Sequence, residues 1–338
     1  MRLAGALAAR VRSGAKKAIG AALFVLCITA LNAAQKPCQK PVWTANLADF
    51  KFRAFKLAKH PRNSLPKVWR TQQGAVFLSP EVIAVYQVLK GEAPLALTSR
   101  QESGGGGEFT LQIEFLDAKD GHVIHSMNAI TSGSDFSGVS PTHDGKFIVR
   151  TGEVVRLYSK NFEELASKPL PLSHRARREW WRLAVTLSGR QIHVEHSEDF
   201  GYDEGAGFER ELLDADSLQT MAVEQNTIAV HWPPKDADPE WGSKFPKSLI
   251  AKHSRLTSAM GAGSVIAGET WEERPNPLDL DLEPKGGRVV IYDDIQKQPC
   301  SIKIAEPLSG WYSMRLYAVS PTGDVAIIQG ITLSLYHP

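Results

Sequence analysis

Short runs in which apolar and polar residues alternate recur along most of the chain, and turn-forming residues separate them. Phe109–Asp117 is the clearest case, because it alternates with a period of two and stops at the turn Lys119-Asp120-Gly121. The segment 122–127 then reads as the strand that returns beside it. Long amphipathic stretches with helical periodicity are absent, whereas Gly and Pro are frequent. This pattern predicts an all-β protein in which many short strands are joined by turns.

One motif recurs at intervals of tens of residues: a strand, a tight turn that contains Gly and often Ser-Pro, and a second strand. It occupies residues 139–149, 186–194 and 319–328. Repetition at this spacing predicts an array of small sheets. We count about six units within residues 68–338, with seven as the alternative. They begin near residues 68, 135, 180, 227, 264 and 315. The fourth unit is short and irregular, with strands predicted at 227–232 and 248–251.

The last unit contains three predicted strands, at 315–319, 325–329 and 332–336. A closed radial array of four-stranded sheets requires a fourth strand there, and that strand must come from elsewhere in the chain. The segment 50–58 remains unassigned before the first unit, so we predict that it completes the last sheet. Residues 35–67 are accordingly interpreted as an N-terminal tail that carries this closing strand.

Residues 1–34 have the features of a secretory signal. A leader with five Lys or Arg and no acidic residue precedes the apolar run 18–31, and small residues follow that run. We predict cleavage after Ala33 or Ala34, which leaves no membrane span; an uncleaved membrane anchor is the alternative. The mature chain then holds 34 basic residues (39 minus 5) and 37 acidic ones, a net charge of −3. A nucleic-acid partner is therefore not expected.

Cleavage of the leader leaves two of the three cysteines, Cys38 and Cys300. An even pair of cysteines in an oxidising compartment favours a disulfide bond, with two unrelated thiols as the alternative. The bond would join the N-terminal tail to a strand late in the chain, where the predicted closing strand also lies. The two features therefore support each other, and both fit a secreted or periplasmic protein.

The Ser-Pro turns, the β-runs that follow them and the terminal Leu-Tyr or Leu-Asp strands resemble the WD40- and YVTN-like β-propeller superfamily, in a divergent bacterial secreted form. The resemblance covers about residues 68–338. The Gly-His and Trp-Asp dipeptides of WD40 blades are missing, apart from Gly121-His122. What the resemblance implies is a disc of about six four-stranded blades around a central channel, a fold often used to bind other proteins.

The sequence contains no arrangement that is typical of a catalytic or metal site. His122 and His125 are three residues apart on a predicted strand, so their side chains point to opposite faces. The carboxylates of 279–283 share one face of an extended chain, as a hard cation requires, but a solvated acidic face is the simpler interpretation. No Gly-x-Ser-x-Gly motif is present. We therefore predict no cofactor, no metal ion and no enzymatic activity.

Two clusters of aromatic and basic residues are candidates for recognition of a partner. Arg177 and Arg178 precede a pair of tryptophans, and Arg and Trp are enriched where proteins bind one another. An inter-blade loop followed by core tryptophans is the alternative interpretation. Trp232 and Trp241 flank a Pro-rich loop, and Trp271 begins the next insertion. Long loops in a compact domain often carry function.

The combined features predict a binding scaffold for a protein or peptide partner, without catalysis. One alternative is a hydrolase or lyase whose polar residues converge in the central channel. The other is a structural protein of the envelope without a small ligand. A single polar cluster built from several sheets would favour the enzyme.

Overall fold

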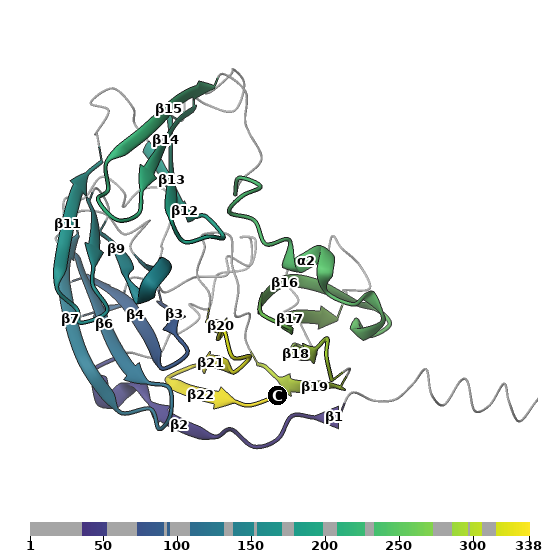
Figure 1. The fold of residues 1–338 in the computed structure, drawn as a ribbon. Helices are drawn as coiled ribbons and strands as arrows, with labels where there is room; N and C mark the ends of the chain where they lie inside the picture. The colour runs from purple at the N-terminus through teal and green to yellow at the C-terminus, as the bar shows by residue number, and fades with distance from the viewer. Residues whose placement is uncertain are drawn as a thin grey trace, which may run out of the picture. The chain divides into compact units, whose positions relative to one another are not determined.

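The computed structural model describes residues 36–52, 73–90, 93–94, 109–131, 138–151, 154–170, 179–198, 208–226, 233–272, 286–296, 298–305 and 316–338. The chain divides into two compact units, Met1–Pro37 and Cys38–Pro338. In the first unit the described part is the short strand β1 (Lys36–Pro37). The predicted signal at 1–34 therefore lies outside the described residues. Strands β2 to β22 belong to the second unit (Figure 1).

The described strands of the second unit form five antiparallel sheets. The first sheet has the order β3 (Gln73–Ser79), β4 (Val82–Lys90), β6 (Phe109–Asp117) and β7 (Val123–Thr131), with β5 (Ala93–Pro94) beside β4. The second sheet comprises β8 (Gly138–Pro141), β9 (Phe147–Thr151), β10 (Val154–Tyr158) and β11 (Glu164–Pro169). The third comprises β12 (Glu179–Val185), β13 (Gln191–Glu198), β14 (Phe208–Asp214) and β15 (Thr220–Asn226).

The two remaining sheets come from the end of the sequence and differ in how they are assembled. The fourth sheet comprises β16 (Ser254–Ala262), β17 (Val265–Glu272), β18 (Arg288–Asp293) and β19 (Gln298–Lys303). The last sheet comprises β20 (Tyr317–Val319), β21 (Val325–Gln329), β22 (Thr332–Tyr336) and β2 (Trp43–Asn46). The prediction of an all-β protein is confirmed.

The last sheet takes its fourth strand from the N-terminal segment, as predicted, but from other residues. β2 pairs antiparallel with β22, with Trp43 opposite Leu335. The predicted segment 50–58 is wrong, because Phe50 ends the 3-10 helix η1 (Leu47–Phe50), and 53–58 lie outside the described residues. The Asn46 side chain accepts a hydrogen bond from the Ala48 backbone N–H (3.2 Å), which begins η1 and ends the strand.

The predicted fourth unit forms no sheet in its described part. Residues 233–250 contain the short helix α2 (Trp241–Lys244), the 3-10 helix η3 (Lys247–Leu249) and turns, so the strand predicted at 248–251 is wrong. The strand predicted at 227–232 lies outside the described residues. The described residues thus form five sheets, against about six predicted units. None of their helices is long and apolar enough to cross a membrane.

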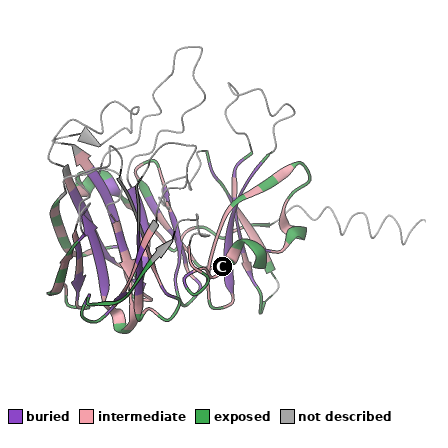
Figure 2. Ribbon diagram, turned by 90° about the horizontal axis from the view of Figure 1, so that it is seen from above, coloured by how far each residue is buried: buried purple, intermediate pink, exposed green. Residues whose placement is uncertain are grey.

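Apolar clusters join neighbouring sheets, and strands such as β9 and β21 are buried on both faces. Ala326 and Ile328 of β21 pack against the first sheet, whereas Val325 and Ile327 pack against the fourth. Similar clusters join the first sheet to the second and the second to the third. Figure 2 shows the buried residues concentrated along the strands. The last sheet in the sequence therefore packs on the first.

Two contacts fasten the N-terminal segment to distant parts of the second unit. The predicted disulfide bond between Cys38 and Cys300 is present, with 4.7 Å between the two Cα atoms. The Trp43 indole N–H donates to the Ala118 carbonyl oxygen (2.8 Å), which lies in the turn between β6 and β7. The ring of Trp43 also lies so close to Gly121 that a Cβ there would approach it to 2.7 Å, and Gly121 has a φ of +77°. The glycine is therefore required for this contact.

Candidate functional site

A cleft of about 710 Å³ opens on one face of the first sheet, beside η1. It is lined by residues of η1 and the next position, of β4, and of the hairpin β6–β7: Asp49, Phe50, Lys51, Leu89, Thr110, Gln112, Glu114, Val123, Ser126 and Asn128. This volume lies in the range of small-ligand and peptide sites in proteins. The described lining contains no His and no Cys, so its chemistry is that of amides, hydroxyls, two carboxylates and one ammonium group.

A row of amide side chains forms the floor beside this cleft. Gln73, Gln87 and Gln112 stand opposite one another on β3, β4 and β6, and Asn128 continues the row on β7. Gln87 is 0% exposed and its Nε2 donates to the Gln112 side-chain oxygen (2.8 Å). The three glutamines are therefore a buried and hydrogen-bonded part of the fold, whereas Asn128 at the end of the row is exposed.

The same amides hold the N-terminal segment against the first sheet. Gln112 Nε2 donates to the Phe50 carbonyl oxygen (2.7 Å) and to Glu114 Oε1 (2.9 Å). Gln87 Nε2 donates to the Lys51 carbonyl oxygen (3.3 Å). The carbonyl oxygens of Phe50 and Lys51 have no strand partner among the described residues. The two glutamine side chains satisfy them instead. The wall of the cleft formed by η1 is thereby fixed.

Glu114 is the buried charge of this site. The residue is 6% exposed, and its carboxylate accepts hydrogen bonds from Gln112 Nε2 and from the Ser126 hydroxyl on β7. Charge-assisted hydrogen bonds of this kind compensate the loss of water around a carboxylate. A carboxylate held in this way at the edge of a cleft attracts a cationic group of a ligand.

The strand pattern of β6 concealed this site. Thr110, Gln112 and Glu114 alternate with Leu111, Ile113 and Phe115, which is typical of a strand with one solvated face. In the structure Gln112 and Glu114 are buried as well, because η1 covers that face. The sequence offers one signal for this buried site: a Gln occurs on each of three successive strands. Buried amides can pair across strands, so these residues can form a row.

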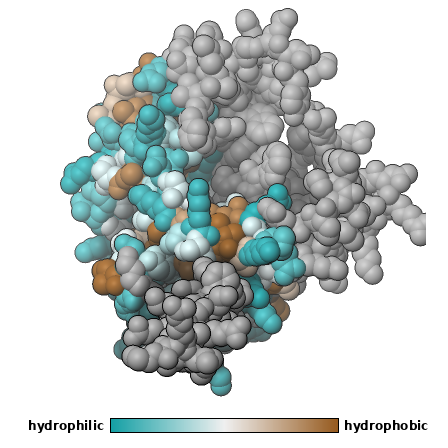
Figure 3. Space-filling model, turned by 90° about the vertical axis from the view of Figure 1, so that its right-hand side faces the viewer, coloured by the Kyte–Doolittle hydropathy of each residue, from teal (hydrophilic) through white to brown (hydrophobic). Residues whose placement is uncertain are grey.

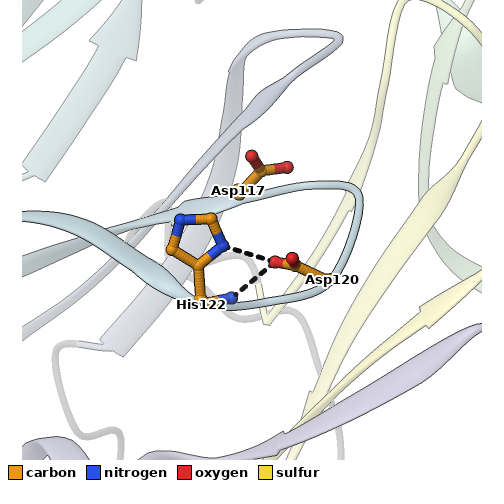
Figure 4. A group of neighbouring side chains, drawn as sticks. All are labelled: Asp117, Asp120 and His122. Atoms are coloured by element: carbon orange, nitrogen blue, oxygen red, sulfur yellow. Dashed lines mark hydrogen bonds and ion pairs between the residues drawn. The ribbon is translucent and has the colours of Figure 1, made fainter.

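The tip of the β6–β7 hairpin carries a second polar group (Figure 4). One oxygen or nitrogen of each of Asp117, Asp120 and His122 lies within 4.8 Å of those of the other two. Asp120 Oδ1 accepts from the His122 backbone N–H (3.1 Å) and lies 2.6 Å from His122 Nδ1. Asp117 Oδ1 accepts from the Lys119 backbone N–H (2.7 Å). The arrangement satisfies a tight turn, and the carboxylates are used for that purpose.

The contact between Asp120 and His122 shifts the pKa of both side chains. The pKa of His122 is raised, first because its ring hydrogen-bonds to Asp120, and Asp117 adds a smaller charge effect. The pKa of Asp120 is lowered, mainly by hydrogen bonds from the backbone and side chain of His122. Both side chains are more than half exposed, so water screens the interaction.

Of the two described residues that were predicted to contact a partner, Trp271 is the more deeply buried. It is 4% exposed at the end of β17 and packs in the apolar cluster between the fourth and last sheets. Its indole N–H donates to Glu269 Oε1 (2.7 Å), and Glu269 Oε2 accepts from the Ser258 hydroxyl (3.1 Å). Trp271 therefore lies in the interior of the described structure, and its contact with a partner stays a prediction.

The other predicted contact residues are placed differently. Trp241 begins α2 and is partly buried, with its ring against Gly261 of β16 and Lys244 Nζ 4.8 Å from the ring centroid. Arg177, Arg178 and Trp232 lie outside the described residues. The structure brings none of the described candidates together with the cleft.

Figure 3 shows how hydrophilic and apolar residues are distributed over one face of the molecule. The described residues on that face are mostly hydrophilic, and the apolar ones form separate small groups. Broad apolar patches are the usual mark of large protein interfaces. The described part of this face therefore shows no such broad patch.

Comparisons with known proteins identify no family. No protein-family model matches the chain, and no curated protein matches it. The chain is similar to the WD40 domain of Pan2 from Neurospora crassa, at 10% identity over 89% of this chain and 97% of that one, with a TM-score of 0.29. It is similar to acylaminoacyl peptidase from Pyrococcus horikoshii, at 10% identity and a TM-score of 0.28, over 77% of this chain.

This chain spans only 36% of the length of the peptidase. The WD40 domain of SCAP from fission yeast is 13% identical over 76% of this chain and 67% of that one, with a TM-score of 0.19. Scores this low carry no argument about family or activity, and the fold conclusion rests on the sheets themselves.

Proposed function

We propose that the protein binds a peptide segment of a protein partner in the cleft between η1 and the β6–β7 hairpin, and that it performs no catalysis. The cleft itself is the observation that carries the proposal: a fixed, mixed polar and apolar groove beside a buried carboxylate. Its polar groups come from one sheet and from the backbone of η1, whereas the enzyme alternative requires convergence from several sheets.

The spacing of the lining supports an extended peptide as the ligand. Thr110, Gln112 and Glu114 lie on alternate positions of β6, and Ser126 and Asn128 do so on β7. Side chains on one strand face repeat about every 7 Å, which is also the repeat of an extended peptide backbone. Donors and acceptors in the lining thus recur at the spacing of every second residue of an extended peptide.

The charges and apolar groups define which peptide fits best. Asp49 and Glu114 are acidic and Lys51 is basic, so the lining has a net negative charge. Phe50 and Leu89 offer apolar contact. A segment with a Lys or Arg next to an apolar residue satisfies both features.

We also propose that the five described sheets are blades of a WD40/YVTN-like β-propeller of about six blades, closed by β2, in a secreted or periplasmic protein. Support for the propeller comes from the packing of the first sheet on the second, of the second on the third, of the fourth on the last, and of the last on the first. The disulfide bond supports an oxidising compartment.

The test begins with a random peptide library displayed on phage and selected on the purified protein. We expect enriched peptides that share a basic and an apolar position. A synthetic fluorescent copy of one such peptide is then titrated by anisotropy against wild type and Ser126→Arg. The arginine fills the cleft beside Glu114, so we expect the peptide to bind at least about tenfold more weakly.

Ser167→Arg is the matched control, because Ser167 is an exposed serine on β11, outside the cleft. It should bind the peptide as wild type does. Glu114→Gln should weaken basic peptides severalfold while neutral analogues are unaffected. A library that yields no binder, or binders that tolerate Ser126→Arg, would overturn the proposal.

A further inference from the structure

β7 is the outermost strand of the first sheet, and no described strand pairs with its outer edge. An edge strand presents a row of backbone N–H and C=O groups that can pair with another chain. After the irregularity between Phe115 and Leu116, β7 pairs residue by residue with β6 from His125 to Thr131. The strand is therefore long, regular and fixed on its inner side.

Proteins usually protect such edges with charges, proline or a short strand. The outermost strands of three other sheets follow this rule. β11 contains Glu164 and Lys168 and ends at Pro169, β15 contains Glu224, and β2 has four residues. β7 has nine residues, Val-Ile-His-Ser-Met-Asn-Ala-Ile-Thr, with neither an acidic or Lys/Arg residue nor a proline. Among these four described edge strands, β7 is the one without such protection.

The exposed side chains of β7 read alike in both directions. Ile124, Ser126, Asn128 and Ile130 form its exposed face, and the two isoleucines are 40% and 66% exposed. Around Met127 the order is apolar, polar, polar, apolar. An antiparallel copy of the strand therefore presents each residue with a partner of its own kind.

We propose that two copies of this protein pair through β7 in an antiparallel manner, with a two-fold axis at Met127. This register places Ile124 opposite Ile130 of the second copy, twice, and Ser126 opposite Asn128. In a two-fold contact, a charged side chain near the axis would lie close to the same charge on the second copy. β7 has no acidic, Lys or Arg side chain, so this repulsion between like charges does not arise. The first sheets of the two copies become one continuous sheet.

The register can be tested with two double variants that differ in one charge. Ile124→Lys/Ile130→Lys places lysine opposite lysine, whereas Ile124→Lys/Ile130→Glu places lysine opposite glutamate at both contacts. Neither isoleucine lines the cleft, whereas Ser126 and Asn128, which lie between them on β7, do. The purified protein, expressed from the full sequence, is studied by sedimentation velocity across a concentration series.

We expect wild type and the Lys/Glu variant to sediment increasingly as dimers at higher concentration. The Lys/Lys variant should dimerise at least about tenfold more weakly. Leu165→Lys, which adds a charge at an exposed position of β11, should behave as wild type. A protein that stays monomeric throughout, or dimers that are equally stable in all variants, would overturn the proposal. Loss of the dimer in both double variants would contradict the register.

Discussion

At the scale of single residues, the tip of the β6–β7 hairpin shows how a turn can set a protonation state. Asp120 accepts a hydrogen bond from the His122 backbone N–H and lies beside its ring, and both side chains are exposed. The pKa of His122 is raised for this reason. The protonated ring is thus the form that folding favours here.

Replacing Asp120 with Asn should lower the pKa of His122 toward its ordinary value of about 6.5. Because the folded pKa is raised, the stability that His122 contributes is present in full below its unfolded pKa. It is lost as the pH rises through the folded pKa. Titration of the imidazole by NMR measures the shift directly.

Asp117→Asn is the matched control for this titration, because Asp117 acts on His122 through charge alone and more weakly. It should lower the pKa less than Asp120→Asn does. Equal shifts in the two variants would mean that the hydrogen bond is not the dominant cause.

Burial of individual residues was the least predictable property. The sequence pattern places Trp271 at the start of an insertion, but β17 extends to Glu272 and carries the tryptophan into the core. Gln112 and Glu114 look solvated in sequence, yet η1 covers them. Both cases depend on which distant segment packs on a strand, and local periodicity contains no information about that.

At the scale of elements, β2 shows which local signals decide between a strand and a turn. The segment 50–58 contains alternating aromatic residues, but Phe50 belongs to η1 and Lys51 adopts a positive φ of 65°. The shorter segment Trp43–Asn46 forms the strand because Trp43 finds a place against Ala118 and Gly121. The tertiary contacts of Trp43, and not the apolar content of the segment, therefore determine which residues form the strand.

Trp43→Ala should lower the free energy of unfolding by about 2–3 kcal/mol, somewhat below the cost for a fully buried tryptophan, because Trp43 is partly buried. The variant loses both the indole hydrogen bond to Ala118 and the contact with Gly121. Urea unfolding followed by circular dichroism measures the change.

Thr44→Ala provides the comparison, since Thr44 is the exposed neighbour on the same strand. It should change the stability by about 0.5 kcal/mol or less. If Trp43→Ala were equally mild, β2 would not be a stabilising part of the last sheet.

The strands themselves were more predictable than their grouping. β6, β9, β18, β21 and β22 lie where periodicity and turn residues indicate. The segment 248–251 was predicted as a strand, but the 3-10 helix η3 and turns occupy it, directly after a proline that cannot donate to a ladder. Composition contained this signal more clearly than the repeat pattern did.

At the scale of the whole molecule, the disulfide bond is the main long-range constraint. Cys38 and Cys300 are separated by 262 residues, and Cys38 also donates its backbone N–H to the Ser301 carbonyl oxygen. The bond joins Cys38, five residues before β2 begins, to Cys300 of the fourth sheet. Counting cysteines after the predicted cleavage was sufficient to predict this bond, because just two remain.

Cys38→Ser/Cys300→Ser should lower the free energy of unfolding by about 2–4 kcal/mol, because the unfolded chain regains the freedom of a very long loop. The single variants Cys38→Ser and Cys300→Ser should match the double variant, since each removes the same bond. Guanidinium unfolding without reductant measures all three. Stability equal to wild type in the double variant would show that the bond does not constrain the unfolded chain.

Synthesis of the chain proceeds in one direction, and this sets the timing of its assembly. Trp43–Asn46 leaves the ribosome early, but its partner Thr332–Tyr336 is made near the end of the sequence. The early strand therefore stays unpaired while the sheets between them are produced, and the last sheet becomes complete in a late step. Contacts at such sequence separation make folding slow and leave an open strand edge for longer.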